Sequence, residues 1–294
     1  MNSVVVIYGP TAVGKSAIGV ELAKLINGEI ISADSMQIYR HLDIGSAKIA
    51  EQEMDSIKHH LINIKEPNEE YSVSEFCHDA KICINNILNK GHVPIVVGGT
   101  GLYIKSLILG YDFAKTDKNE DFRLSLSNLS NEEIYKKIKR IDPNCYIDKN
   151  NRRRLIRQLE KLTFGHKESY NKDNNLKFHL FAILDDRNKI YERINNRVEV
   201  MVRNGLIDEA KYLLSLNLPD NNQAIKAIGY KEIFPYLKNE QSLEECISLL
   251  KQKSRNYAKR QITFLNQFDD ICKINFCGVK ETANIIYENL KGKL

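Results

Sequence analysis

The chain has 294 residues, of which 43% are hydrophobic and 28% are charged, and its formal net charge is +5. This composition is typical of a globular protein with a full core, and so mild a positive charge does not by itself establish a polyanionic partner. No apolar run approaches the ~20 residues that span a bilayer, and the first predicted strand begins too early to follow a secretory signal, so we expect a cytoplasmic protein. The six cysteines form no CxxC pair, which favours reduced thiols over disulfides or zinc ligands.

A phosphate-binding loop is predicted directly after the first strand. A β-like run at 4–8 leads into residues that match the pattern GxxxxGK[ST], namely Gly9, Pro10, Thr11, Ala12, Val13, Gly14, Lys15 and Ser16. An amphipathic stretch follows at 16–26, which completes the strand, loop and helix that such a loop requires. Main-chain N–H groups of the loop and the helix N-terminus bind phosphate, while Lys15 adds charge and Ser16 a hydroxyl for Mg²⁺. The sequence therefore predicts a site for a diphosphate or triphosphate, and a Gly-rich turn without a ligand is the alternative.

Strand-like and helical segments alternate through the first third of the chain. Strands are predicted at 29–33 and 93–97, and a helix at 72–89 begins with the spacing of a capping box. This alternation predicts an α/β domain with a parallel sheet. Because loops at the carboxyl ends of parallel strands meet at one edge, we expect 9–16, Asp34 and 98–101 to lie together.

Two polar residues follow the predicted strands. Asp34 comes directly after 29–33, where a carboxylate can position Mg²⁺ through water or accept a proton from a nucleophile. Thr100 follows Gly98 and Gly99, which permit close approach of a ligand. For both residues the alternative is a capping role at the start of a turn or helix.

The region 114–174 has no strand-like run and carries many charges. It is predicted to form a small helical insertion, with helices at 130–140 and 151–162, so that the core comprises 1–113 and 175–294. A strand at 177–184 resumes the core. Four further helices are predicted over 188–204, 206–216, 223–236 and 242–268.

Basic side chains gather in three places. Arg193 and Arg197 are spaced i,i+4 on a predicted helix, where they could bind an anionic diphosphate or pair with local acids. Two further clusters suit a nucleic acid, although solvated helix faces would look similar. Their members are Lys149, Arg152, Arg153, Arg154 and Arg157, and then Lys251, Lys253, Arg255, Lys259 and Arg260.

Seven segments, in this order, resemble the tRNA dimethylallyltransferase family, whose members are also called tRNA isopentenyltransferases or IPP transferases. They are GPTAVGKS at 9–16, ISADSMQIYRHLDIGSAK at 31–48, VGGTGLY at 97–103, NNRRRLIRQLE at 150–160, RINNRVEVMVRNGL at 193–206, AIGYKE at 227–232 and AKRQITFL at 258–265. The phosphate loop alone is shared by many enzymes, but the combination is specific to this family.

The resemblance implies a P-loop α/β enzyme, most simply a monomer, that transfers a dimethylallyl group from dimethylallyl diphosphate to N6 of the adenine on the 3′ side of the tRNA anticodon. It implies that Gly9 to Ser16 and Arg197 bind the donor diphosphate, that Ser16 helps to hold Mg²⁺, and that Asp34 is the general base. Thr100 would contact the target base. The positions that match tRNA contacts of the family are Asp34, Ser35, Met36, Gln37, Thr100, Arg123, Arg153, Arg154, Leu155, Ile156 and Arg157.

Three other functions remain open from the sequence. The phosphate loop by itself would favour a small-molecule phosphotransferase that uses ATP. Prenylation of free adenine nucleotides is a second possibility, although a mononucleotide would not require the basic insertion. A non-catalytic RNA-binding module is the third, and it would leave Asp34 and the phosphate loop without a purpose.

Overall fold

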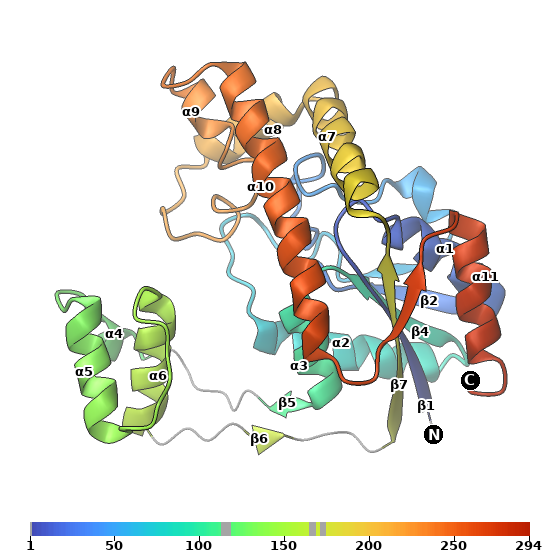
Figure 1. Ribbon diagram of the computed structural model, residues 1–294, viewed down its shortest axis with the longest axis horizontal. Coiled ribbons are helices and arrows are strands. Elements are labelled where there is room, and N and C mark those ends of the chain that lie inside the picture. The colour runs from blue at the N-terminus through green and yellow to red at the C-terminus, as the bar shows by residue number, and fades with distance from the viewer. Residues whose placement is uncertain (1, 113–118, 165–168, 171–174) are drawn as a thin grey trace. The chain divides into compact units, whose positions relative to one another are not determined.

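The computed structural model describes residues 2–112, 119–164, 169–170 and 175–294, and it divides into two compact units. The larger unit comprises 1–109 and 173–294, and the smaller unit comprises 110–172. Figure 1 shows the chain coloured from its N-terminus to its C-terminus. Among the described residues, no helix has both the length and the apolar character needed to cross a membrane.

The larger unit is built on a sheet of six parallel strands, which confirms the predicted α/β fold with a parallel sheet. The strand order is β3-β2-β4-β1-β7-β8. Because β1 lies between two neighbours and both faces of the sheet are covered, the side chains at 4–8 are fully buried and read as a continuous apolar run. The strands are β1 (Asn2–Tyr8), β2 (Gly28–Ser32), β3 (His59–His60), β4 (Val93–Gly98), β7 (Leu176–Leu184) and β8 (Cys272–Asn275).

The described part of the larger unit also contains helices. They are α1 (Lys15–Ile26), α2 (Val73–Leu88), α3 (Gly101–Leu109), α7 (Arg187–Arg203), α8 (Leu206–Ser215), α9 (Phe234–Leu237), α10 (Leu243–Phe264) and α11 (Val279–Leu290), with 3₁₀ turns η1 (Glu51–Met54) and η2 (Leu265–Gln267). Ile18 and Leu22 of α1 share a core with Ile286 and Leu290 of α11. Phe76 of α2 stacks on Tyr103 of α3 with ring centroids 4.4 Å apart.

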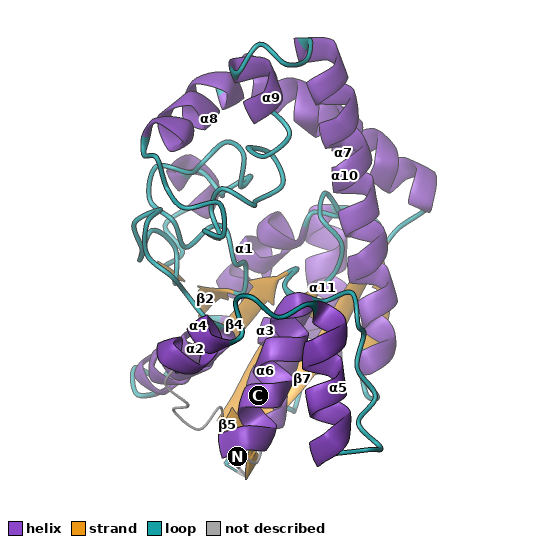
Figure 2. Ribbon diagram, turned by 90° about the vertical axis from the view of Figure 1, so that its left-hand side faces the viewer, coloured by secondary structure: helices purple, strands orange, loops and turns teal. Residues whose placement is uncertain are grey.

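Two long helices of this unit, α7 and α10, lie side by side (Figure 2). Ile190 and Ile194 of α7 pack with Ala258 of α10 in an apolar cluster. The α10 helix begins as predicted, with a capping box in which Ser242 and Glu245 bind each other's main-chain N–H groups. This contact places the motif at 258–265 next to the motif at 193–206.

The predicted helix over 223–236 is wrong. Residues 223–233 form successive turns, and the helix is limited to α9, which has a proline in its first turn. Gly229 has a φ of +116°, which an α-helix excludes, and its N–H donates to the carboxylate of Glu232 at 3.0 Å. Tyr230 of this segment is fully buried although the segment is not helical.

The smaller unit contains α4 (Glu120–Ser125), α5 (Asn131–Ile141) and α6 (Arg152–Phe164), together with the antiparallel pair β5 (Tyr111–Asp112) and β6 (Ser169–Tyr170). The two helices expected in the insertion are therefore confirmed, while the expectation that it has no strand is wrong at β6. Leucine and isoleucine side chains of α5 and α6 form a separate core. The Arg152 guanidinium closes one end of this unit by donating to the carbonyl oxygens of Leu126, Ser127 and Leu129.

Candidate active site

The loops after β1, β2 and β4 meet at the carboxyl edge of the sheet, as predicted. The strands β2, β4 and β1 are consecutive in the sheet, so their ends are neighbours. The N–H of Thr100 donates to the carbonyl oxygen of Ala33 at 3.2 Å, and the Thr100 hydroxyl accepts from the N–H of Ser35 at 3.2 Å. Thr100 is thus tied to the residues on both sides of Asp34.

Glycines make this convergence of loops possible. A Cβ at Gly98 would lie 2.2 Å from the carbonyl oxygen of Ala33, and one at Gly99 would lie 2.1 Å from Nε2 of Gln261. At Gly101 it would lie 2.3 Å from the ring of Phe264. The glycines of the VGGTGLY segment therefore allow close packing against the chain after β2 and against side chains of α10, and at Gly98 the contact is with main-chain atoms that a side chain could not displace.

The phosphate loop turns tightly between β1 and α1. Gly14 has a φ of +95° and Ala12 a φ of +63°, so two of its residues adopt the left-handed conformation. The Lys15 ammonium donates to the carbonyl oxygen of Pro10 at 2.6 Å, across the mouth of the loop. The exposed side chain of Ser16 lies in the first turn of α1, where a phosphate oxygen and a metal ion are ordinarily bound.

Arg193 and Arg197 of α7 both reach this loop, but they have different partners. Arg197 donates from Nη1 to the hydroxyl of Thr11 at 3.2 Å. Arg193 forms an ion pair with Asp185 and donates to the carbonyl oxygen of Ala12 at 3.3 Å. Arg193 therefore contacts the main chain of the loop and is paired with a local acid. Arg197 instead contacts a side chain of the loop.

The surroundings of Lys15 and Arg197 disfavour the charged forms of both side chains. Burial, and then the neighbouring Arg197, lower the pKa of Lys15 to about 7, against a smaller opposite effect of Asp34. Burial also lowers the pKa of the Arg197 guanidinium. By solvent accessibility Lys15 is partly buried and Arg197 is exposed. Two neighbouring cations repel each other, so an anion bound between them would be stabilised by both.

Asp34 makes the capping contact that was one of its two predicted roles, and it also lies near the cations of the site. Its Oδ1 accepts from the N–H of Met36 at 2.8 Å and, at a longer 3.4 Å, from that of Gln37, so the carboxylate caps a turn. Its charge also acts on Lys15 and Arg197, whose pKa values it raises against the effect of burial. The carboxylate is therefore near enough to Lys15 and Arg197 to act on their charges, while the turn fixes its orientation.

The segment that follows Asp34 is anchored from α8 through one carboxylate. Glu209 accepts from the N–H groups of Asp43, Ile44 and Gly45 at 2.7, 2.9 and 2.8 Å, and from the hydroxyl of Tyr230 at 2.6 Å. A Cβ at Gly45 would lie 2.6 Å from the Tyr230 ring. Tyr230 belongs to the AIGYKE segment at 227–232. This segment therefore packs against the residues around Gly45, which follow Asp34 in the chain.

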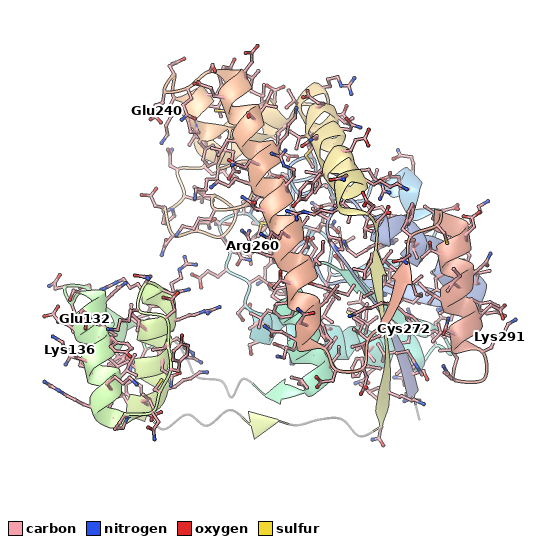
Figure 3. All side chains as sticks on the ribbon, in the orientation of Figure 1. Glu132, Lys136, Glu240, Arg260, Cys272 and Lys291 are labelled. Carbon is pink, nitrogen blue, oxygen red and sulfur yellow. The ribbon has the colours of Figure 1, made fainter. Side chains whose placement is uncertain are left out.

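Two residues of α10 belong to the site although sequence analysis did not single them out. The Tyr257 side chain lies near those of Thr100 and Gln261, and burial and then the charge of Asp34 raise the pKa of its hydroxyl. Gln261 accepts from the N–H of Thr11 and donates to the carbonyl oxygen of Gly99. The sequence did contain a signal for these two residues. Gln261 lies in the AKRQITFL segment and Tyr257 lies four residues before Gln261, a spacing that places both on one face of a helix. Arg260, labelled in Figure 3, is exposed next to them and lies over the Tyr257 ring, 5.6 Å from its centroid.

In the smaller unit, Glu160 organises two of the predicted tRNA contacts. Its side chain is 1% exposed and pairs with Arg123 at 2.8 Å and Arg157 at 2.7 Å. Burial alone would raise the pKa of Glu160, but hydrogen bonds from both arginines lower it to about 2. The two guanidinium groups are therefore held together at one place on the unit.

The other predicted contacts of α6 differ in exposure. Arg153 and Arg154 are exposed, and Ile156 is partly buried. The Leu155 side chain is fully buried in the core of the unit, so any contact to a ligand at this position would involve its main chain.

A metal site made by the protein alone is absent from the described part of the chain, which holds no cluster of three or more His, Cys, Asp or Glu side chains suited to an ion. Ser16 borders a small pocket together with Ser32 and Gln37. A hydroxyl beside a phosphate loop fits Mg²⁺ that takes most of its oxygen ligands from the phosphates and from water.

Comparison with known proteins gives matches along nearly the whole chain. Residues 37–268 match a family described as IPP transferase, and residues 2–67 match one described as isopentenyl transferase. The tRNA dimethylallyltransferase of Streptococcus agalactiae is 46% identical over 263 residues, which are 88% of this chain and 87% of that protein. The protein of the same name from Lactococcus lactis is 46% identical over 283 residues, which are 94% of this chain and 95% of that protein.

Solved structures agree with these matches. The tRNA isopentenylpyrophosphate transferase of Bacillus halodurans has a TM-score of 0.75 and 39% identity, and the match covers 99% of this chain and 97% of that one. The corresponding protein of Staphylococcus epidermidis has a TM-score of 0.74 and 34% identity over the whole of both chains. A eukaryotic dimethylallyltransferase described as acting on tRNA has a TM-score of 0.79 and 28% identity over 94% of this chain and 74% of its own.

Proposed function

The chain belongs to the IPP transferase family, and from this premise we propose that it transfers a dimethylallyl group from dimethylallyl diphosphate to N6 of the adenine on the 3′ side of the tRNA anticodon. The main support for this proposal is that four residues lie together at one edge of the sheet, namely Lys15, Arg197, Asp34 and Thr100. Cations on one side suit a diphosphate, and a carboxylate with a hydroxyl on the other suits a nucleobase amine.

The donor diphosphate binds in the phosphate loop, between its N–H groups, Lys15 and Arg197. Negative charge grows on the diphosphate as the bond between the allylic carbon and oxygen breaks, and these cations stabilise it. Support comes from the environment of Lys15, whose pKa of about 7 without an anion reflects burial beside Arg197. An anion bound there would favour the charged form of Lys15 and would offset its repulsion by Arg197.

Mg²⁺ is the proposed cofactor, with the Ser16 hydroxyl as its protein ligand. Bound to the diphosphate, the ion supplies further positive charge to the leaving group. The lack of a carboxylate or histidine cluster among the described residues agrees with an ion that depends on the diphosphate for most of its ligands.

Asp34 is the proposed general base and Thr100 the proposed contact of the target adenine. The new bond joins N6 to the allylic carbon, the proton of N6 passes to the Asp34 carboxylate, and diphosphate leaves. Support comes from the turn that fixes Asp34 through the N–H of Met36. An adenine in a loop can be splayed out of its stack at a cost of about a few kcal/mol, which allows it to reach such a site.

The tRNA is proposed to contact the segment 34–37 and the helical insertion, through Arg123 and through Arg153, Arg154, Leu155, Ile156 and Arg157. Support comes from the exposure of Arg153 and Arg154 and from the pairing of Arg123 and Arg157 on Glu160. Guanidinium groups bind phosphate in a bidentate manner, so such contacts should be sensitive to salt. A monomeric cytoplasmic enzyme remains the expectation from the sequence.

The deciding experiment incubates the purified protein and Mg²⁺ with labelled dimethylallyl diphosphate, and in parallel with labelled ATP, each with and without unmodified tRNA. We expect a five-carbon mass gain on tRNA in the first reaction alone. Phosphate release or transfer from ATP that does not depend on tRNA would indicate a phosphotransferase instead. Prenylation of free adenine nucleotides at a comparable rate would indicate that the acceptor is a mononucleotide.

A further inference from the structure

The Gln261 side chain is buried between two loops of the candidate site. The residue is 5% exposed. Its Oε1 accepts from the N–H of Thr11 at 2.8 Å, and its Nε2 donates to the carbonyl oxygen of Gly99 at 2.9 Å. One carboxamide therefore connects the loop proposed to bind the diphosphate with the loop that carries Thr100.

Neighbouring groups hold this carboxamide in place. The hydroxyl of Tyr8 donates to the main-chain oxygen of Gln261 at 2.8 Å, which ties α10 to β1. Tyr257, one turn earlier on α10, lies near the Gln261 side chain. Gly99 leaves space for Nε2, because a Cβ there would lie 2.1 Å from it. The bridge is therefore buried and closely approached by Gly99.

We propose that Gln261 is a positioning residue that sets the separation between the donor loop and the acceptor loop by accepting from Thr11 and donating to Gly99 at the same time. The inference rests on the prenyl-transfer function proposed above. Neither contact touches the reacting atoms, so the residue acts through the two loops. A displacement of reacting groups by about 1 Å can slow a reaction roughly 10²-fold, so loss of the bridge should lower kcat more than donor affinity.

Replacement by glutamate separates this role from a merely structural one. In Gln261→Glu, an ionised carboxylate can accept from Thr11 but has no proton to donate to Gly99. The protonated carboxyl can do both, because its carbonyl oxygen accepts and its hydroxyl donates. Burial raises the pKa of the introduced carboxyl, so the bridge should return as the pH falls.

Other titrating groups around this position do not mimic that effect. Burial raises the pKa of both Tyr8 and Tyr257, so their hydroxyls stay neutral in the range tested. The charges nearest to Tyr257 are Asp34 and Arg260. Because these and Lys15 are present in wild type as well, the ratio of variant to wild-type kcat isolates the introduced carboxyl.

The test measures kcat and donor KM of wild type, Gln261→Glu and Gln252→Glu between about pH 6 and pH 8.5, with circular dichroism at each pH. Gln252 is an exposed glutamine on the same helix and serves as the control. We expect the ratio for Gln261→Glu to rise roughly tenfold toward low pH, while donor KM stays within about threefold and Gln252→Glu follows wild type. A ratio that does not change with pH would overturn the inference. An inactive wild type would instead overturn the proposed function.

A second set of variants decides the matter if Gln261→Glu does not fold. Gly99→Ala places a methyl group where Nε2 lies, so it should displace the carboxamide without changing its chemistry. We expect the Gly99→Ala, Gln261→Ala double variant to be no slower than Gln261→Ala alone, since the shorter side chain removes the clash. Losses that multiply in the double variant would show that the two residues act independently and would contradict the bridge.

Discussion

The Lys15 ammonium donates to the carbonyl oxygen of Pro10 at 2.6 Å, so in the absence of an anion this lysine binds its own loop. Burial beside Arg197 lowers its pKa to about 7. A diphosphate should displace the carbonyl contact and raise the pKa again. We therefore expect Lys15 of the free enzyme to lose its charge as the pH rises above about 7, and Lys15 of the complex to keep it.

The first prediction is that donor binding takes up a proton at pH 8 and takes up far less at pH 6. Titration calorimetry in buffers of different ionisation enthalpy measures this uptake. The diphosphate itself also titrates, and Lys15→Arg supplies the control because arginine is charged in both states. Equal proton uptake by wild type and Lys15→Arg would contradict the lowered pKa.

The second prediction concerns Asp34, whose Oδ1 accepts from the N–H of Met36. Asp34→Asn keeps an oxygen that can accept this hydrogen bond, but it removes the basic carboxylate. We expect turnover to fall by roughly 10²–10⁴, while the thermal stability of the protein changes little. Single-turnover prenylation of tRNA is the measurement. Unchanged turnover would reduce Asp34 to a capping residue.

The third prediction separates tRNA binding from donor binding. Arg154 is exposed on α6, and Arg154→Ala should weaken tRNA binding and lower the slope of its salt dependence by about one charge. Donor affinity should not change. Lys136→Ala, an exposed position on α5 labelled in Figure 3, is the control from the same unit. Equal losses of tRNA affinity in the two variants would mean that Arg154 contributes only to net charge.

The fourth prediction concerns Glu209, which accepts from three consecutive N–H groups beginning at Asp43. In Glu209→Gln the amide nitrogen has no acceptor among them, so the segment should shift. Gln37 donates to the carbonyl oxygen of Ala47 at 3.3 Å, which connects that segment to the proposed tRNA contacts. We expect a several-fold higher KM for tRNA with donor KM retained, whereas Asp208→Asn at an exposed neighbour should match wild type. A rise in donor KM alone would contradict this role.

The sequence was sufficient to predict four of the six strands, β1, β2, β4 and β7, and the convergence of the loops that follow three of them, but the short edge strands β3 and β8 were not predicted. The phosphate loop and Asp34 lie directly after buried apolar runs, and parallel topology brings such ends together. The contribution of Gln261 was missed because it depends on α10 packing across loops far away in the chain. The turns at 223–233 were missed for a similar reason: Gly229 leaves the helical region so that Tyr230 can reach Glu209, which helical spacing alone does not reveal.

The last prediction concerns stability, and it involves a buried carboxylate of β2 outside the candidate site. Glu29 is paired with His60 at 2.7 Å, His92 at 2.8 Å and Lys90 at 3.0 Å. Burial alone would raise its pKa, but these hydrogen bonds lower it from 4.5 to about 2. The unfolded chain therefore binds more protons than the folded one between these values, so the stabilisation is complete above about pH 4.5 and is lost as the pH falls toward 2.

Glu29→Gln should accordingly destabilise the protein by about 1–3 kcal/mol at pH 7 and flatten the decline of its unfolding free energy below pH 5. Urea unfolding at a series of pH values measures both effects. Glu240→Gln, at an exposed position after α9 labelled in Figure 3, is the control and should retain the wild-type curve. A Glu29→Gln curve parallel to that of wild type from pH 7 to pH 3 would show that the ion pairs of Glu29 do not govern acid stability, because only a carboxylate with a lowered pKa makes the two curves converge as the pH falls.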